Sequence, residues 1–140
     1  MQRVNKAPII KAEEIEMRET FIRVASAMDI ECISEFLTEE SEEVYQIIYL
    51  NSKTEIMATQ NFRPDPSNPS VLSNRDIFKS ALFLDASSLI ICHTHGNKKS
   101  EPSMLDKGIS EQIKQAGSFI GIAVLDSLFV YKNTFKSLNI

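Results

Sequence analysis

The sequence has few cysteines, no long apolar run and no excess of positive charge, and each absence excludes a class of protein. The two cysteines among its 140 residues, Cys32 and Cys92, are too few for a disulfide framework, so we expect reduced thiols and a cytoplasmic protein. No apolar run approaches the ~18 residues that a membrane span needs, and the polar start at residues 1–6 does not resemble a secretory signal. A formal net charge of -4 provides no broad basic surface, so we do not expect non-specific nucleic-acid binding.

The length and composition fit one compact domain of mixed α/β class. An apolar share of 43% and a charged share of 24% are ordinary for a globular protein, and there is no internal repeat. Residues 1–20 are polar and only weakly periodic, so we expect an irregular segment there and a single domain over 21–140. Strands and helices alternate along that domain, and several neighbouring strands are linked as hairpins. This pattern predicts a mixed β-sheet with helices packed on its faces.

Local patterns place the elements. Ser-x-x-Asp spacings followed by apolar stripes predict helices that begin at Ser26, at Ser73 and at Pro102-Ser103, the last of them ending at Gly117. The three prolines of residues 62–70 exclude that stretch from a central sheet and predict a surface loop. Runs rich in β-branched and aromatic residues predict the strands, at residues 21–24, 44–50, 54–59, 88–93, 121–131 (with a possible break near Asp126) and 134–138.

The only two histidines of the chain fall in one tripeptide, His93-Thr94-His95, at the end of an apolar strand. Side chains of an extended segment alternate between its two sides, so both imidazoles can point the same way. Two neutral imidazoles on one side form half of a tetrahedral zinc site. A purely structural role would leave their shared strand end and ligand spacing unexplained, so we interpret both as metal ligands.

Asp106 is the candidate for the third ligand, because the polar loop after His95 can fold the first turn of the next helix back to the histidines. Two histidines and one carboxylate leave the fourth position for water, and zinc lowers the pKa of such a water from 15.7 to roughly 7. The spacing of Ser103 and Asp106 is also that of a helix cap. Both roles are compatible, since the helix dipole stabilises a carboxylate at this position.

A general base must take a proton from that water and pass it to the leaving nitrogen. Glu43 directly precedes a predicted core strand and is the best-placed carboxylate by pattern. It belongs to an acidic run at residues 39–43, which in most proteins is a solvated helix end. The pattern alone therefore leaves a structural role for Glu43 open.

Together these residues resemble the JAMM signature of the MPN-type metalloproteases, and more closely its RadC-like bacterial branch. The resemblance covers about residues 22–138, without the helix-hairpin-helix segment that usually precedes this domain in full-length RadC. It implies an MPN/JAMM-like fold, a mixed β-sheet flanked by helices with a cytidine-deaminase-like core. The stretches that carry it are Glu43 with residues 44–51, the helix at 74–82, His93-Thr94-His95, the Glu-Pro-Ser-x-x-Asp run at 101–106, Ala116-Gly117, and residues 124–126.

The resemblance also implies a mechanism and a partner. His93, His95 and Asp106 match the zinc ligands, and Glu43 matches the acid/base that hydrogen-bonds the metal-bound water. Ser103 matches the hydroxyl that stabilises the tetrahedral intermediate. The implied activity is zinc-dependent hydrolysis of peptide, isopeptide or related amide bonds, so the expected partner is a peptide or another amide-containing substrate. Base deaminases are excluded, because they need a Pro-Cys-x-x-Cys ligand pair that this sequence lacks.

The chain departs from the family pattern at three places. Gly96 stands where a proline is usual, and its backbone freedom predicts a looser loop beside the metal. Ser127 replaces the usual histidine, which removes a contact to the site or to the substrate, and the loop at 62–70 replaces a glycine-rich segment. The Gly96 and Ser127 departures keep open one alternative, a non-catalytic MPN-fold binding module. A second alternative, a DNA-repair-associated accessory protein, is suggested only by the family's name.

Overall fold

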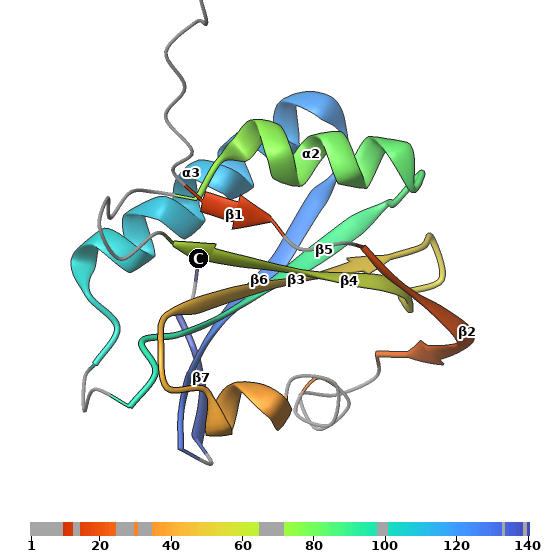
Figure 1. Ribbon diagram of the computed structural model, residues 1–140. Coiled ribbons are helices and arrows are strands. Elements are labelled where there is room, and N and C mark those ends of the chain that lie inside the picture. Colours follow the sequence, from red (N-terminus) through yellow and green to blue (C-terminus); the bar gives the residue numbers. More distant parts are fainter. Residues whose placement is uncertain are drawn as a thin grey trace, which may run out of the picture.

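The computed structural model describes residues 10–12, 15–24, 30, 35–64, 72–97, 101–132, 134–138 and 140. Its strands form one seven-stranded sheet in the order β1-β4-β3-β5-β6-β7, with β2 also paired to β4 (Figure 1). The strands are β1 (Ile10–Ala12), β2 (Glu16–Arg23), β3 (Val44–Leu50), β4 (Glu55–Pro64), β5 (Ser88–Thr94), β6 (Ala123–Tyr131) and β7 (Thr134–Ser137). The helices are the short 3-10 helix η1 (Glu35–Glu39), α2 (Asn74–Phe83) and α3 (Met104–Ile120).

The sheet is mixed, as the sequence predicts. The central strands β3 and β5 are antiparallel and buried at every residue, which agrees with their apolar, β-branched composition. Strand β6 runs parallel to β5, and α3 forms the crossover between them. Because β5 and β6 are parallel, their carboxyl ends lie at the same end of the sheet, where the His93-Thr94-His95 tripeptide ends β5.

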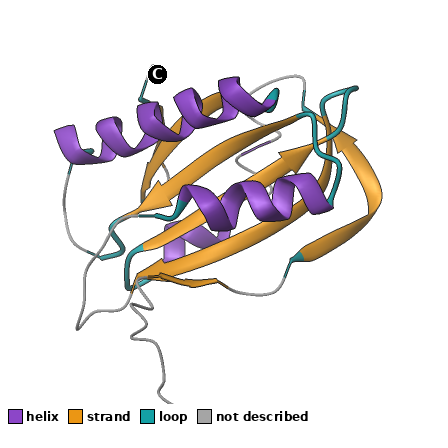
Figure 2. Cartoon of the chain, turned by 90° about the horizontal axis from the view of Figure 1, so that it is seen from above, coloured by secondary structure: helices purple, strands orange, loops and turns teal. Residues whose placement is uncertain are grey.

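Different elements pack against the two faces of the sheet. Alternate residues of the central strands, such as Ile47 and Ile91, form one apolar cluster with α2 and α3. The intervening residues, such as Ile48 and Cys92, form a second cluster with Leu37 of η1. Figure 2 shows α2 and α3 side by side over the same face. His93 has the same parity as Ile91, so the strand directs it toward the face that α3 covers.

The start of the chain differs from the expected irregular segment at residues 1–20. Strand β1 and the first residues of β2 fall inside that segment, and both pair with β4, β1 at its end and β2 along its first half. The expected short strand at 21–24 is the end of β2. The prediction failed because β1 and β2 are held in place by their pairing with β4, whereas their own sequences show little periodicity.

Strand β4 is longer than predicted, because it continues to Pro64. Phe62, expected in a loop, is fully buried and pairs with Tyr45 of β3. The first proline of the loop stands at the last residue of the strand, where a missing N–H costs the ladder least. The rest of the expected loop, residues 65–70, lies outside the described residues. So do most residues of the helix predicted to begin at Ser26, of which the structure describes Ile30 and η1.

Helix α3 continues past the predicted stop at Gly117 and ends at Gly121, which adopts a left-handed φ of 79°. Gly117 is needed for close packing instead, because a Cβ there would collide with the carbonyl oxygen of Ile122. The expected break near Asp126 is a register shift in the pairing of β5 and β6, at Leu125. None of the described helices is long and apolar enough to cross a membrane.

Candidate metal centre

Four side chains from three parts of the chain converge at the carboxyl end of β5. Glu43, His93, His95 and Asp106 each offer a ligand atom, and these four atoms all lie within 4.8 Å of one another. Among the described residues no other group of histidine, cysteine, aspartate and glutamate side chains meets this criterion. The structure thus brings together the three expected metal ligands and the expected acid/base.

The distances from the Asp106 carboxylate oxygens to the two imidazoles are close to those between the ligand atoms of a small tetrahedral metal ion. Nε2 of His95 lies 3.0 Å from Oδ2 of Asp106, and Nδ1 of His93 lies 3.7 Å from Oδ1. Bonds of about 2.0–2.1 Å to a tetrahedral zinc ion separate its ligand atoms by about 3.3 Å, a value between these two distances. The donors are two imidazoles and a carboxylate, a set that zinc accepts, so the residues present fit a divalent metal.

The first turn of α3 positions Asp106. Its backbone N–H donates to Oγ of Ser103 over 3.0 Å, and its Oδ2 accepts the N–H of Ser103 over 2.8 Å, which makes a complete capping box. Burial alone would raise the pKa of this carboxyl, but the hydrogen bond with His95, the Ser103 N–H and the charges of both imidazoles lower the pKa of Asp106 to about 2. Asp106 is therefore a carboxylate at neutral pH, the form that binds metal.

Aromatic rings fix the imidazoles. The Tyr45 ring stacks on His93 with centroids 3.8 Å apart and planes inclined by 5°. The Phe129 ring meets both imidazoles edge-on, 5.9 Å from His93 and 4.9 Å from His95. Burial, and then the negative charges of Glu43 and Asp106, raise the pKa of Tyr45 above its usual range, so its phenol stays neutral. Sequence reasoning missed both rings, although their strand positions beside the histidines could have indicated them.

Glu43 differs from the other three in its exposure and its support. Its side chain is 38% exposed, against 2% for His93 and 6% for Asp106, and it lies in the irregular segment before β3. Its Oε2 lies 2.8 Å from Nε2 of His93 and 3.9 Å from Nε2 of His95. A carboxylate that contacts both imidazoles and also faces solvent can exchange protons with the outside.

The loop at Gly96 packs closely against the segment that carries Glu43. It is therefore not loose, contrary to the expectation from its glycine. Gly96 is buried with a φ of 79°, and a Cβ there would lie 2.5 Å from the carbonyl oxygen of Ser41 and 2.6 Å from the N of Glu42. The N–H of Asn97 donates to the same Ser41 oxygen over 3.3 Å. Glycine is therefore required here for close approach as well as for backbone conformation.

A bidentate ion pair supports the segment from the other side. Both terminal nitrogens of Arg63 donate to the carboxylate of Glu40, over 3.2 and 2.9 Å. Arg63 is on β4 and Glu40 directly follows η1, so the pair ties the chain that leads to Glu43 onto the sheet. The sequence carried no local signal for this contact, because the two residues are far apart in the chain.

Ser127, another departure from the family pattern, pairs with Ile91 of β5 and so lies on the same face of the sheet as His93, but it is not one of the four grouped residues. It is fully buried, and its hydroxyl lies 2.7 Å from that of Ser110, one turn after Asp106 on α3. Since Ser127 is on β6, this hydrogen bond joins α3 to the sheet just below the candidate metal centre. The residue thus contributes to helix placement.

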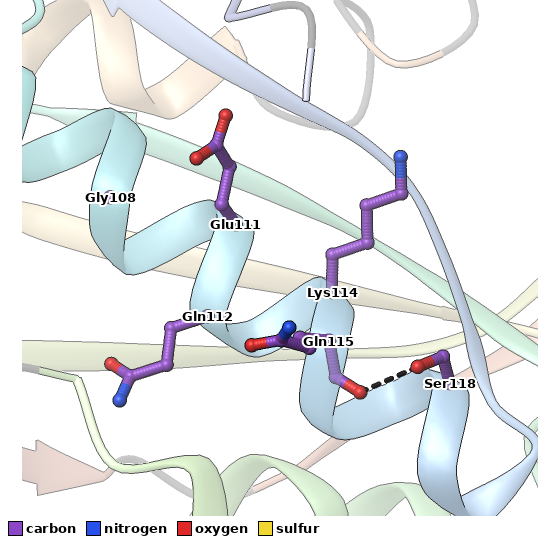
Figure 3. Close-up of a pocket in the computed structure, with 6 residues that line it drawn as sticks. All are labelled: Gly108, Glu111, Gln112, Lys114, Gln115 and Ser118. Carbon is purple, nitrogen blue, oxygen red and sulfur yellow. Dashed lines mark hydrogen bonds between the residues drawn. The ribbon is translucent and has the colours of Figure 1, made fainter.

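A separate cavity lies on the outer side of α3, away from the four-residue group. It is lined by exposed residues of α3 alone, and Figure 3 shows their side chains pointing outward from the helix. The residues are Gly108, Glu111, Gln112, Lys114, Gln115 and Ser118. Buried Asp106 lies on a different side of the helix, so this cavity is not part of the candidate metal centre.

A mixed sheet with two helices on one face and a histidine–carboxylate group at a strand end is the architecture of the JAB/MPN-like proteins. The profile of the RadC-like JAB domain matches residues 13–139 of the chain. The chain therefore belongs to the RadC-like JAB domain family. The match also begins within the segment that the sequence led us to expect as irregular.

Curated relatives agree with this assignment. The chain is 34% identical over 102 residues to a UPF0758 protein of Clostridium beijerinckii, covering 73% of this chain and 44% of that protein. It is 33% identical over 116 residues to a UPF0758 protein of Chlorobium chlorochromatii, covering 82% and 52%. A UPF0758 protein of Alkaliphilus metalliredigens is 30% identical over 132 residues, covering 91% and 56%. The chain thus spans about half the length of these relatives.

Proposed function

We propose that the chain is a zinc-dependent hydrolase of peptide, isopeptide or related amide bonds. The observation that carries the proposal is the convergence of Glu43, His93, His95 and Asp106 within 4.8 Å at the end of β5. Membership of the RadC-like JAB family supports the same site. In this proposal His93, His95 and Asp106 hold the metal, and Glu43 and Ser103 act on the substrate side.

The donor set favours zinc over the other common divalent ions. Magnesium and calcium prefer oxygen ligands throughout, whereas two imidazoles and one carboxylate are typical of hydrolytic zinc. A zinc ion held there would supply Lewis acidity and a water of lowered pKa. The ionised Asp106 contributes the negative charge that a divalent cation requires, since its pKa is about 2.

The position of Glu43 supports its proposed role as a proton carrier. Its carboxylate contacts the ring nitrogens of both histidines, yet more than a third of its side chain is exposed. In the proposed reaction Oε2 accepts a proton from the attacking water and delivers it to the leaving nitrogen. A proton carrier has to reach both the nucleophile and the departing amine, and a half-exposed carboxylate at the rim of the group can do so.

Ser103 is proposed to donate a hydrogen bond to the developing oxyanion. Its Oγ already accepts the N–H of Asp106, so the hydroxyl is oriented by the start of α3. An oxygen that accepts one hydrogen bond keeps its own hydrogen for donation. A donor fixed in this way stabilises charge in the transition state without having to reorganise.

The proposal is tested by metal analysis together with an assay. Protein purified without added metal should contain about one zinc per chain, or bind that amount when zinc is added. It should cleave members of a panel of peptides, isopeptides and small amides, lose this activity with a chelator and regain it with zinc. Less than about 0.2 zinc per chain after zinc addition would contradict the proposed centre. Full zinc without cleavage of any substrate would favour a binding module.

A further inference from the structure

Four side chains form a row across one face of the sheet, and the candidate metal centre is only its middle. Tyr45 on β3 pairs with His93 on β5, His93 pairs with Phe129 on β6, and Phe129 pairs with Lys136 on β7. Residues directly opposite each other on neighbouring strands point to the same face of a sheet. The row therefore leads from the stacked Tyr45 and His93 rings, across Phe129, to a lysine.

The packing of β7 confirms which way Lys136 points. Its neighbour Phe135 packs against the apolar cluster on the opposite face, which contains Val130. Alternation along the strand then directs Lys136 to the face of α3 and of the histidines. Its side chain is 62% exposed, so the ammonium group stands at the solvent side of the row.

Lys136 forms only a weak ion pair, with Glu101. Its Nζ lies 3.7 Å from Oε2 of Glu101, whose side chain is 87% exposed. Ion pairs as exposed as this one contribute little to stability and are readily exchanged. Glu101 belongs to the segment just before Ser103, so the pair lies beside the proposed position of the substrate.

We propose that Lys136 is a specificity-determining residue that binds a carboxylate of the substrate close to the amide that is cleaved. This inference rests on the proposed hydrolase function and adds a substrate class to it, amides with a nearby carboxylate. Neighbouring strands are about 4.8 Å apart, so the backbone of Lys136 lies about 10 Å from that of His93, or about three residues of extended peptide. The carboxylate can be that of an acidic side chain or of the chain's own C-terminus.

Glu101 distinguishes recognition from a structural tie. If the pair only held the loop before α3, removing either partner would change the affinity for every ligand in the same direction. In the recognition role Glu101 competes with the substrate for Lys136. Removal of Lys136 then weakens binding of carboxylate ligands, whereas removal of Glu101 strengthens it.

The experiment measures binding, so it does not depend on turnover. Short peptide hydroxamates, whose hydroxamate group binds zinc, are titrated calorimetrically into the zinc-loaded protein. One carries glutamate two or three residues from the hydroxamate, its match carries glutamine, and a third carries glutamine with a free C-terminal carboxylate in place of an amide. We expect the better carboxylate ligand to bind about three- to tenfold more tightly than the neutral one.

Three variants complete the test. Lys136→Met should abolish the preference and Glu101→Gln should enlarge it, with the affinity for the neutral hydroxamate unchanged in both. Lys132→Met is the matched control, because it removes the same charge from the same hairpin, where Lys132 lies 5.5 Å over the Tyr131 ring. Equal loss of the preference in the Lys132 and Lys136 variants would overturn direct contact.

The outcomes separate this inference from the function on which it rests. Equal binding of all three hydroxamates by the wild-type protein would overturn the role of Lys136 and leave the hydrolase proposal intact. Failure of every hydroxamate to bind the zinc-loaded protein would overturn both. A preference for the side-chain carboxylate or for the C-terminal one identifies the source of the charge.

Discussion

The two halves of the candidate centre are built differently. His93 and Asp106 are buried, and they belong to a central strand and to the capped first turn of a helix. Glu43 is half-exposed in an irregular segment, and Gly96 and the Arg63–Glu40 pair hold that segment from two sides. Regular structure thus holds these candidate metal ligands, whereas the proposed proton carrier depends on contacts between segments that are distant in the chain.

This contrast means that metal binding and catalysis should respond separately to mutation. Changes on β5 or α3 should remove both, because no proposed chemistry remains without the metal. Changes around the Glu43 segment should reduce catalysis while zinc stays bound. If every variant affected the two properties equally, the division between a rigid half and a supported half would be wrong.

The largest effect is expected for Asp106→Asn. The amide keeps an oxygen for the cap but loses the charge that holds the metal, so zinc affinity should fall by more than the roughly 100-fold typical of lost outer-shell partners. Hydrolysis should then fall below detection. Asp76→Asn is a matched control, because Asp76 stands three residues after the N-cap Ser73 of α2 just as Asp106 follows Ser103. Zinc content measured in both variants should change only in the first.

Glu43→Gln should reduce the rate about 10²- to 10⁴-fold, the usual contribution of a positioned proton carrier, with about one zinc still bound. The amide keeps the size of the side chain but cannot accept the proton. Glu42→Gln is the control, because Glu42 is exposed and is not in the four-residue group. Steady-state kinetics and metal analysis on the same samples decide the outcome. An unchanged rate would remove Glu43 from the mechanism.

Gly96→Ala should cost about 3 kcal/mol of stability, from a left-handed backbone conformation and a steric collision with Ser41. The variant should also lose more activity than zinc, because the collision displaces the segment that carries Glu43. Gly121→Ala separates the two causes, since Gly121 has the same φ of 79° but open space around its Cβ position. Its cost should be only about 1 kcal/mol by urea unfolding, with activity unchanged. Equal losses of unfolding free energy in the two variants would show that the Ser41 backbone can move away from the added methyl group at little cost.

The predictable part of the centre is the part built from local sequence. The alternation of β5 gave the shared direction of the histidines, and the Ser-x-x-Asp spacing gave both the cap and the position of Asp106. The mixed sheet followed from the order of strand-like and helix-like segments. Each of these features depends on residues within a few positions of one another.

The features missed by sequence reasoning depend on contacts between distant segments. Nothing near Gly96 in sequence shows that the Ser41 carbonyl fills the space of its absent side chain. The pairing of β1 with β4 likewise depends on Phe62, Arg63 and Pro64, which the prolines had assigned to a loop. Gly117 was taken as a helix end because close helix packing and termination both favour glycine.

Acid should weaken the metal-free protein through Asp106. The pKa of this carboxyl is lowered from 3.8 to about 2 in the folded protein, so its ionisation stabilises the fold above about pH 4, and that contribution is lost as the pH falls through about 2. The difference corresponds to about 2 kcal/mol. Urea unfolding of wild type and Asp106→Asn from pH 6 to pH 2 should therefore give free energies that converge at the acid end. Parallel curves would contradict the lowered pKa.

The smallest effect is expected at the Arg63–Glu40 pair, which should change catalysis without changing the metal. Arg63→Gln should lower stability by about 1 kcal/mol, because the pair is bidentate but partly exposed. It should also lower the rate a few-fold at full zinc content, since the segment before Glu43 loses one of its two supports. Arg75→Gln, at an exposed position of α2, is the control for loss of an arginine.

Combining Arg63→Gln with Glu40→Gln should add little to either single change, because both remove the same contact. Additive effects on the rate would show that the ion pair does not position Glu43, and Gly96 would then be its main support.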